Sequence, residues 1–336
     1  MERYFLGNNS GYGFWNDYDA ELKGKDRVAL LKGGPGTGKS TLMKKIAEYA
    51  KKAGHDIELW YCSGDPNSLD GVYIKDTNRA VVDATAPHAS GVDIPIVKDR
   101  IFDLAQSLKP YKLRGVREDI EKLMNCKKQC FMRVYQHLKS ALCHCDNKMQ
   151  LEKQTVDDGG VRAYAYKIAD VLRREKCDMK ENRKLFSHAI CPSGESTYFD
   201  HLRGARIYLV DGCEYAISVF FDELSKLLKG CTLLQNPLDP TRYEGVLRGG
   251  VAVVSDAGHF KGDVSEMVNL GTFQKGGFEE DLKDEENGRV LQTAFAVSKL
   301  NLAKKTHEQI EEKFIKAMDF SINEKLTAQV AEFLLE

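Results

Sequence analysis

Gly33-Gly34-Pro35-Gly36-Thr37-Gly38-Lys39-Ser40, followed by Thr41, matches the pattern G-x-x-x-x-G-K-[ST] without a gap. Before it, residues 27–32 (Arg-Val-Ala-Leu-Leu-Lys) are typical of a short buried strand. After it, apolar side chains recur at helical spacing, at Leu42, Ile46, Tyr49, Ala50 and Ala53. A strand, a glycine-rich loop and a helix in this order are the context in which the pattern indicates a phosphate-binding loop, or P-loop.

The residue types of this loop suit a nucleoside triphosphate. Glycines let the backbone curl so that its N–H groups point inward at phosphates, where a β-carbon would obstruct them. We expect Lys39 to contact the β- and γ-phosphates and the Ser40 hydroxyl to bind Mg²⁺. The predicted nucleotide-binding residues are Gly33, Gly34, Pro35, Gly36, Thr37, Gly38, Lys39, Ser40 and Thr41.

A second copy of the same unit follows later in the chain. The segment Arg27-Val-Ala-Leu-Leu-Lys-Gly33 is matched by Arg206-Ile-Tyr-Leu-Val-Asp-Gly212. The spacing between partners decreases steadily along the chain, to 171 residues between His88 and His259. Chance matches would scatter instead of keeping this order, so the sequence predicts an internally duplicated α/β fold.

The second copy lacks the phosphate loop. Asp65 follows Gly33 by 32 residues, whereas the corresponding Asp239 follows Gly212 by 27. The five missing residues fall where the loop should be, and the replacement Gly212-Cys-Glu-Tyr-Ala216 has neither the lysine nor the hydroxyl. Its Glu214 would also repel a phosphate. We therefore expect one nucleotide site and one degenerate half.

Helical segments are expected after each α/β unit, because apolar residues recur there at three- and four-residue steps. The predicted fold class is α/β, with P-loop NTPase three-layer units, mainly parallel sheets and a helical hairpin after each unit. The hairpins pack on each other as a bundle or offer a surface to a protein partner, and the bundle is the simpler interpretation. The predicted domains are 1–96 (P-loop unit), 97–182 (helical), 183–275 (degenerate repeat) and 276–336 (C-terminal helical segment).

At this point the chain resembles a family of bacterial tandem P-loop ATPases. The resemblance rests on Leu31-Lys-Gly-Gly-Pro-Gly-Thr-Gly-Lys-Ser-Thr-Leu-Met-Lys-Lys45 and on Cys62-Ser-Gly-Asp-Pro-Asn-Ser-Leu-Asp-Gly71. It continues through Val82-Asp-Ala-Thr-Ala-Pro-His88 and, in the second copy, through Leu185-Phe-Ser-His-Ala-Ile-Cys-Pro192. Members of that family usually keep a second P-loop, and this chain departs from the pattern there. The resemblance implies ATP as the nucleotide, at a single site.

Two acids are candidates for the catalytic work that a P-loop alone does not supply. Asp83 ends the apolar strand Ala80-Val81-Val82, which would place its carboxylate beside the P-loop and the metal. Asp65 follows the strand at 57–62 and is the rival, although Asp239 persists where no nucleotide is expected. The predicted catalytic residues are Lys39, Asp83 and Asp65, and the predicted metal ligands are Ser40 and Asp83. We interpret Asp70 and His88 as structural, because Glu244 and His259 match them in the degenerate half.

The degenerate half also offers basic side chains that can reach across to the γ-phosphate. Arg206, Arg242 and Arg248 are the candidates, and the sequence alone does not choose among them.

Composition narrows the class of protein. The 336 residues carry a net charge of −1, so no basic field draws the chain to nucleic acid or to an anionic membrane. No apolar run approaches the roughly 20 residues that span a bilayer. The first residues lack the layout of a signal peptide, and nine cysteines are an odd count that favours reduced thiols over a disulfide framework. These features predict a cytoplasmic protein with no membrane partner, and nucleic acid is not an expected ligand.

The sequence thus predicts a Mg²⁺-dependent ATPase or ATP-driven switch. Two alternatives stay open: a small-molecule or nucleotide kinase that uses the same loop, and a nucleotide-gated scaffold with negligible turnover. A kinase usually has a mobile arginine-bearing lid over an acceptor pocket, and the sequence shows no such signature.

Overall fold

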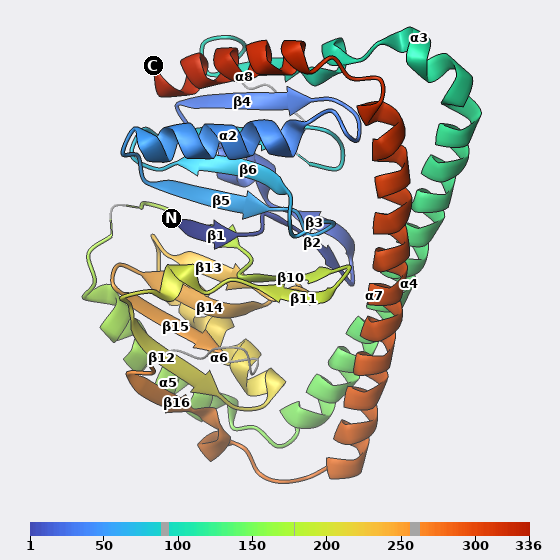
Figure 1. The fold of residues 1–336 in the computed structure, drawn as a ribbon. Helices are drawn as coiled ribbons and strands as arrows, with labels where there is room; N and C mark the ends of the chain where they lie inside the picture. Colours follow the sequence, from blue (N-terminus) through green and yellow to red (C-terminus); the bar gives the residue numbers. More distant parts are fainter. Residues whose placement is uncertain (89–93, 178, 256–262) are drawn as a thin grey trace.

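Two six-stranded sheets with the same strand order form the centre of the molecule (Figure 1). The computed structural model describes residues 1–88, 94–177, 179–255 and 263–336. The first sheet has the order β1 (Glu2–Tyr4), β5 (Ile57–Tyr61), β6 (Leu69–Ile74), β7 (Arg79–Asp83), β4 (Arg27–Lys32) and β8 (Asp99–Asp103). The second sheet has the order β9 (Arg183–Leu185), β13 (Thr232–Gln235), β14 (Tyr243–Arg248), β15 (Val251–Ser255), β12 (Arg206–Asp211) and β16 (Glu266–Asn269).

Most neighbouring strands in both sheets are parallel. In the first sheet β4 is parallel to β7 and to β8, and β1 is parallel to β5, whereas β6 is antiparallel to both of its neighbours. The second sheet repeats this pattern, with β14 as the antiparallel strand. The expectation that residues 97–182 are helical is wrong at its start, because Asp99–Asp103 is the edge strand β8 of the first sheet.

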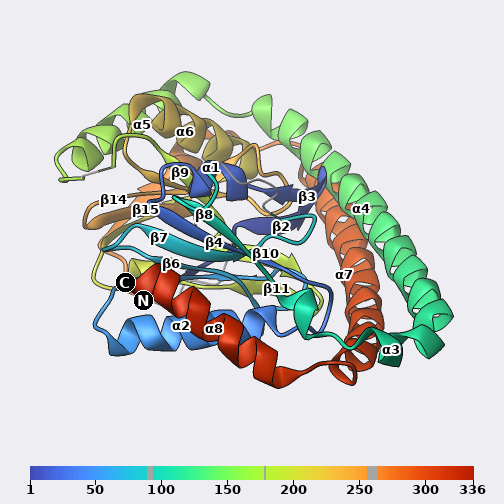
Figure 2. The same ribbon diagram turned by 90° about the horizontal axis from the view of Figure 1, so that it is seen from above.

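The two sheets pack against each other, which corrects the predicted three-layer units. Along β4, Val28 and Leu30 belong to the core that the sheets share, whereas Ala29 and Leu31 face helices on the outer side. Both faces of each sheet are apolar and must be buried. Each sheet therefore packs against helices on one face and against the other sheet on the opposite face. The layers therefore run helices, sheet, sheet, helices, with α2 and α8 on one side and α5 and α6 on the other (Figure 2).

Each outer helix layer combines both halves of the chain. Helix α2 (Lys39–Lys52) covers the first sheet together with α8 (Phe320–Leu335), whose Leu326, Val330 and Leu334 are buried in the first core. Helix α6 (Glu214–Leu227) covers the second sheet together with α5 (Asp158–Arg173). At roughly 1.5–3 kcal/mol per fully buried aliphatic side chain, each exchanged helix contributes several kcal/mol to the other half.

Two 37-residue helices connect the halves: α4 (Arg117–Lys153) and α7 (Glu279–Ile315). They lie antiparallel along one side of the molecule, with Asp119 paired to Lys313 near one end and His144 paired to Glu285 near the other (Figure 1). The predicted hairpin after each unit is therefore wrong in its pairing. The long helices pair with each other, and the short helix that follows each of them packs on the opposite sheet.

The ends of the long helices are fixed by equivalent contacts in the two halves. Backbone bridges join Leu108 to Met318 and Val156 to Gln274. The helices that follow also begin alike, because the Asp157 carboxylate accepts a hydrogen bond from Gly159 N, and Asp319 accepts one from Ser321 N. Such caps satisfy backbone donors at the start of a helix.

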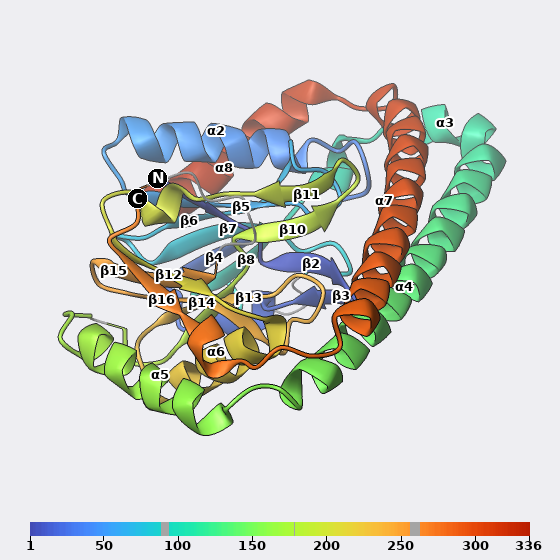
Figure 3. The ribbon, with the colours of Figure 1, turned by 90° about the horizontal axis from the view of Figure 1, so that it is seen from below.

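Short elements complete the molecule. The hairpins β2–β3 (Gly7–Ser10 and Gly13–Asn16) and β10–β11 (His188–Cys191 and Gly194–Thr197) lie between the sheets and the long helices (Figure 3). The remaining helical pieces are α1 (Tyr18–Leu22), α3 (Pro110–Leu113), η1 (Leu104–Ser107), η2 (Arg114–Val116), η3 (Asp200–Leu202) and η4 (Leu270–Phe273).

A buried ion-pair cluster ties the two halves together near the sheet interface. Arg183 of the second half lies 2.8 Å from the carboxylate oxygens of both Glu21 and Glu58, and Glu58 is completely buried. Burial opposes ionisation of Glu58, but the charge and hydrogen bonds of Arg183 and the hydrogen bond from Trp60 together outweigh it and hold the pKa of this carboxyl below its usual value. Removing either partner would leave an uncompensated buried charge.

Among the described residues, no helix is long and apolar enough to cross a membrane.

Candidate functional site

The glycine-rich loop lies between a central strand and the start of a helix, as the motif predicts. Strand β4 ends at Lys32, and α2 begins at Lys39. Between them Gly36 and Gly38 have φ angles of +67° and +84°, a conformation that favours glycine. The buried Thr37 side chain closes the loop, since its hydroxyl donates to Gly34 O at 2.8 Å.

Lys39 folds back onto the loop. Its ammonium group donates to Gly33 O at 2.9 Å and to Gly34 O at 3.0 Å, and it lies 3.6 Å from Asp83 Oδ2. Both side chains are mostly buried. The structure therefore brings together the predicted lysine and one of the two predicted acids.

Asp83 is positioned by the pairing of β7 with β4, which sets Asp83 opposite Leu31 at the end of the strand before the loop. Its Oδ1 accepts a hydrogen bond from Thr85 N at 2.8 Å, and the Thr85 hydroxyl donates to Gly33 O at 2.9 Å. The carboxylate thus both holds a turn and lies beside the loop.

The other predicted residues of the site lie around this pair. The Ser40 hydroxyl accepts from Leu69 N at 3.0 Å, whereas Thr41 is exposed on α2. Asp65 is 2.9 Å from Lys304 of α7 and accepts from the Ser68 hydroxyl at 2.8 Å. Although burial opposes it, these two hydrogen bonds lower the pKa of Asp65. The interactions of Asp65 are therefore those of a turn residue tied to α7.

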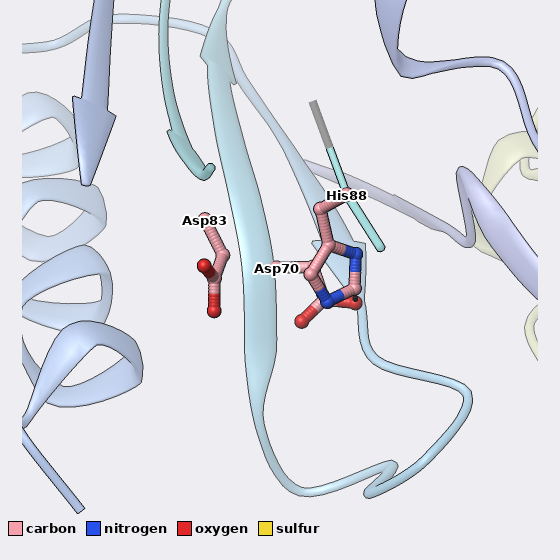
Figure 4. Close-up of side chains that lie close together, drawn as sticks. All are labelled: Asp70, Asp83 and His88. Atoms are coloured by element: carbon pink, nitrogen blue, oxygen red, sulfur yellow. Dashed lines mark ion pairs between the residues drawn. The ribbon is translucent and has the colours of Figure 1, made fainter. Parts of the chain in front are cut away.

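Three potential metal ligands meet beside the loop: Asp70, Asp83 and His88 (Figure 4). One ligand atom from each lies within 4.8 Å of the others. Asp70 is 4% exposed, and burial raises the pKa of its carboxyl. Asp70 Oδ2 and His88 Nδ1 lie 3.8 Å apart, and neither has a hydrogen-bond partner within the described residues. Sequence reasoning treated both residues as structural.

One feature of the sequence pointed to this cluster, although the comparison of the two repeats had favoured a structural role for Asp70 and His88. Because β6 runs antiparallel beside β7, with Gly71 opposite Val82, Asp70 comes next to Asp83 at the same sheet edge. The second half keeps Glu244 at the equivalent of Asp70 but has Ser255 in place of Asp83. Only the first half therefore combines two carboxylates here, and His259 lies outside the described residues.

The C-terminal helices cover the P-loop. A Glu311 carboxylate oxygen of α7 accepts from Gly36 N at 3.2 Å, and the Asn323 side chain of α8 donates to Thr37 O at 2.9 Å. A β-carbon on Gly36 would lie only 2.8 Å from Glu311 O. The loop that is expected to hold phosphate is thus in direct contact with the helix that crosses between the two halves.

Residues 8–81 match the family described as Nephrocystin 3, N-terminal. The matched segment contains the P-loop and ends just before Asp83. No curated protein and no solved structure matches the chain. The family's description does not name a P-loop ATPase, and the match does not reach the second half. The resemblance to tandem P-loop ATPases therefore stays a prediction.

The three arginines proposed to reach across from the second half are engaged elsewhere. Arg206 pairs with Glu175, Arg242 pairs with Asp146 and Asp239, and Arg248 donates to the carbonyl of Gly230. These partners belong to the second half or to the end of α4 that covers it. In the part of the chain that the structure describes, these interactions give no support to a role of the three arginines at the γ-phosphate, which stays a prediction.

Proposed function

We propose that the first half of the molecule binds a nucleoside triphosphate together with Mg²⁺, and hydrolyses it or uses it as a switch. The observation that carries this proposal is the pairing of Lys39 with Asp83 across the ends of two adjacent parallel strands. The lysine emerges from the glycine-rich loop, and the acid ends the neighbouring strand. A P-loop NTPase fold for this half is part of the proposal, and ATP is proposed as the nucleotide on the family resemblance.

The residues of the loop suggest distinct roles in binding. The N–H groups of residues 34 and 36–40 would cradle the phosphates at the positive end of the α2 dipole. Lys39 would exchange its bonds to Gly33 O and Gly34 O for the β- and γ-phosphate oxygens. Because those carbonyls lie in the same loop, this exchange needs only a side-chain movement.

The residues near Asp83 suit a divalent cation. Carboxylate and hydroxyl oxygens are ligands that Mg²⁺ accepts, so Asp83 and Ser40 would hold it, and an imidazole also suits Mn²⁺ or Zn²⁺. The unpartnered Asp70 Oδ2 and His88 Nδ1 support a cation beside Asp83. When bound, Mg²⁺ would neutralise charge that develops on the phosphate oxygens.

An assay of phosphate release from ATP with Mg²⁺ distinguishes the three proposed activities. Steady release without an acceptor supports an ATPase, and ADP formation that requires an added acceptor supports a kinase. Tight binding without turnover supports a nucleotide-gated scaffold. The contact between Glu311 and Gly36 N favours a switch over a constitutive hydrolase, because nucleotide and helix α7 would compete for the same loop amide.

Lys39→Ala tests the site itself. We expect the variant to lose nucleotide binding by at least roughly a hundredfold while keeping its fold, since two charge-assisted phosphate contacts disappear. Lys51→Ala, at an exposed position of the same helix, is the matched control. Native ATP binding by Lys39→Ala, measured by calorimetry, would remove the P-loop from the function.

A further inference from the structure

The P-loop already accommodates one negatively charged group. Glu311 lies in the last turns of α7, and its carboxylate accepts a hydrogen bond from Gly36 N. Burial and the charge of Asp65 hold the pKa of Glu311 above its usual value, although the bond from Gly36 and the charges of Lys39 and Lys127 oppose them. A carboxylate on a loop amide marks where an anion is bound, because such amides favour negative charge.

Two further basic side chains surround Glu311. Lys127 of α4 donates to His307 Nδ1 at 2.8 Å, and His307 Nε2 lies 3.6 Å from Glu311 Oε1. Burial, Lys127 and Lys39 together lower the pKa of His307 to about 4, so its imidazole is neutral at pH 7 and accepts a hydrogen bond from Lys127. Burial also lowers the pKa of Lys127. Within the described ranges, no carboxylate forms an ion pair with Lys127.

The second half has a basic residue at the position equivalent to Lys127, and the surroundings of the two residues can be compared. Lys127 and Arg289 are both the eleventh residue of a 37-residue helix, in α4 and α7 respectively. Arg289 is paired chiefly with Glu286 of its own helix, and the charge of Glu214, in the first turn of α6, makes a smaller contribution to raising the pKa of Arg289. Lys148 lies 3.4 Å from Glu214. The start of α6 therefore has its own anion, matched by cations from the long helices. The start of α2 has the equivalent cation and a glycine-rich loop, with no acidic residue in its first turn.

From this comparison we infer that Lys127 and His307, carried by the α4–α7 helix pair, belong with Lys39 to a single polyphosphate-binding site. Glu311 occupies this site in the nucleotide-free protein and leaves it when the polyphosphate binds. The inference rests on the proposed function. It assigns to Lys127 the role of the additional cation at the phosphates, for which the sequence had suggested Arg206, Arg242 or Arg248. It also makes nucleotide binding a signal to α7, since the same residues hold this helix on the loop.

The experiment measures the affinity of the full chain for Mg²⁺–ATP and for inorganic triphosphate by calorimetry. Lys127→Gln is expected to weaken both by roughly tenfold or more, as the loss of one charge-assisted hydrogen bond does. Lys127→Arg keeps the charge that the second half has at Arg289, and we expect it to stay within about threefold of the native affinity. Glu311→Gln is expected to tighten binding by about threefold to tenfold, because the competing charge is removed.

Exposed neighbours on the same helices provide the controls. Lys128→Gln changes the net charge as Lys127→Gln does, and Glu312→Gln changes it as Glu311→Gln does. Neither control should shift the affinity. Native affinity in Lys127→Gln, beside a Lys39→Ala variant that no longer binds, would overturn this inference and leave the proposed function standing. Native affinity in both variants would overturn the proposed function itself. Weaker binding by Glu311→Gln would show that Glu311 supports the nucleotide and does not compete with it.

Discussion

The starts of α2 and α6 differ more than any other equivalent regions of the two halves. Strand β4 reaches α2 through residues 33–38, whereas β12 reaches α6 through residues 212 and 213 alone. In the second half a buried carboxylate of Glu152, at the end of α4, accepts from Tyr215 N at 2.8 Å. In the first half the corresponding bond joins Glu311 to Gly36 N and is more exposed. The start of α6 is thus contacted by a buried acid, whereas the start of α2, where we propose that phosphate binds, is contacted by a more exposed one.

Apart from the starts of α2 and α6, the two halves keep the same architecture. Both sheets keep the same strand order, and both receive a helix from the other half. The second half therefore lacks the glycine-rich loop but keeps its role as a packing partner. This explains why Ile207, Val210, Val251 and Val254 are still buried although no phosphate loop follows β12.

Separating the two halves of the chain is expected to have the largest effect. A fragment ending at Arg174 would lack α8, which buries Leu326, Val330 and Leu334 in the first core, and would expose the apolar face of α5. We expect it to aggregate or to lose ATP binding. The measurement is size-exclusion chromatography with nucleotide binding.

Addition of residues 183–336 as a separate chain tests whether the missing helices account for this result. Because this fragment contains α6 and α8, it should restore solubility and binding. A fragment 1–174 that is monomeric, stable and fully active by itself would contradict the exchange of helices as a requirement.

The next largest effect distinguishes the two acids of the first half. Asp83→Asn should reduce Mg²⁺-dependent phosphate release by roughly a hundredfold or more, since a proposed ligand of the metal that neutralises the phosphate charge is lost. Asp65→Asn should cost much less, because Asp65 is held by Lys304 and Ser68 in a turn. The reverse ranking would move the metal or water-positioning role to Asp65.

Matched substitutions in the exchanged helices test whether both halves depend on them equally. Leu172 of α5 and Leu334 of α8 are the fifteenth residue of their helices, and both are completely buried. Each change to alanine should lower the free energy of unfolding by about 2–5 kcal/mol. Urea unfolding checks both variants, with the exposed Glu332→Ala as the control. A loss in only one half would show that the exchange stabilises the halves unequally.

The sequence was sufficient for the parts of this comparison that are local. Arg27–Lys32, the glycines and Leu42 to Ala50 specify strand, loop and helix from neighbouring residues, and the repeat indicates two related sheets. The partners of each face were not predictable. Val28 and Ala29 are both apolar, and nothing in their order says that one faces a sheet and the other a helix from residues 320–335.

The same limit applied to the candidate site. Lys39 and Asp83 were predictable because each follows a strand whose direction the motif determines. Glu311, Lys127 and His307 lie on long amphipathic helices, where charged residues are ordinarily solvated. Their role depends on which end of α4 and α7 reaches the loop, and this is set by the exchange between the halves.

The smallest expected effect concerns the second half and pH. Burial opposes protonation of His188, but Glu244 and Glu195 outweigh it and raise the pKa of His188 to about 10. Because this is above the unfolded value of about 6.5, the stabilisation is complete below pH 6.5 and is lost as pH rises toward 10.

Urea unfolding at pH 6.5 and at pH 9 measures this contribution. The native chain should lose stability between the two values by on the order of 1 kcal/mol more than His188→Gln does. Equal losses in the two proteins would mean that His188 is not protonated in the folded state.

The exchange of α8 has a consequence for the order in which the protein forms during synthesis. Contacts between Leu31 and residues such as Val330 join parts of the chain that are translated far apart in time. Domains generally fold as units from the N-terminus while the ribosome is still adding residues. Here the outer face of the P-loop sheet is covered only in part, by α2, until residues 320–335 have been made. The packing of the loop region, whose motif is made early, is therefore completed only when the last helix of the described chain has been made.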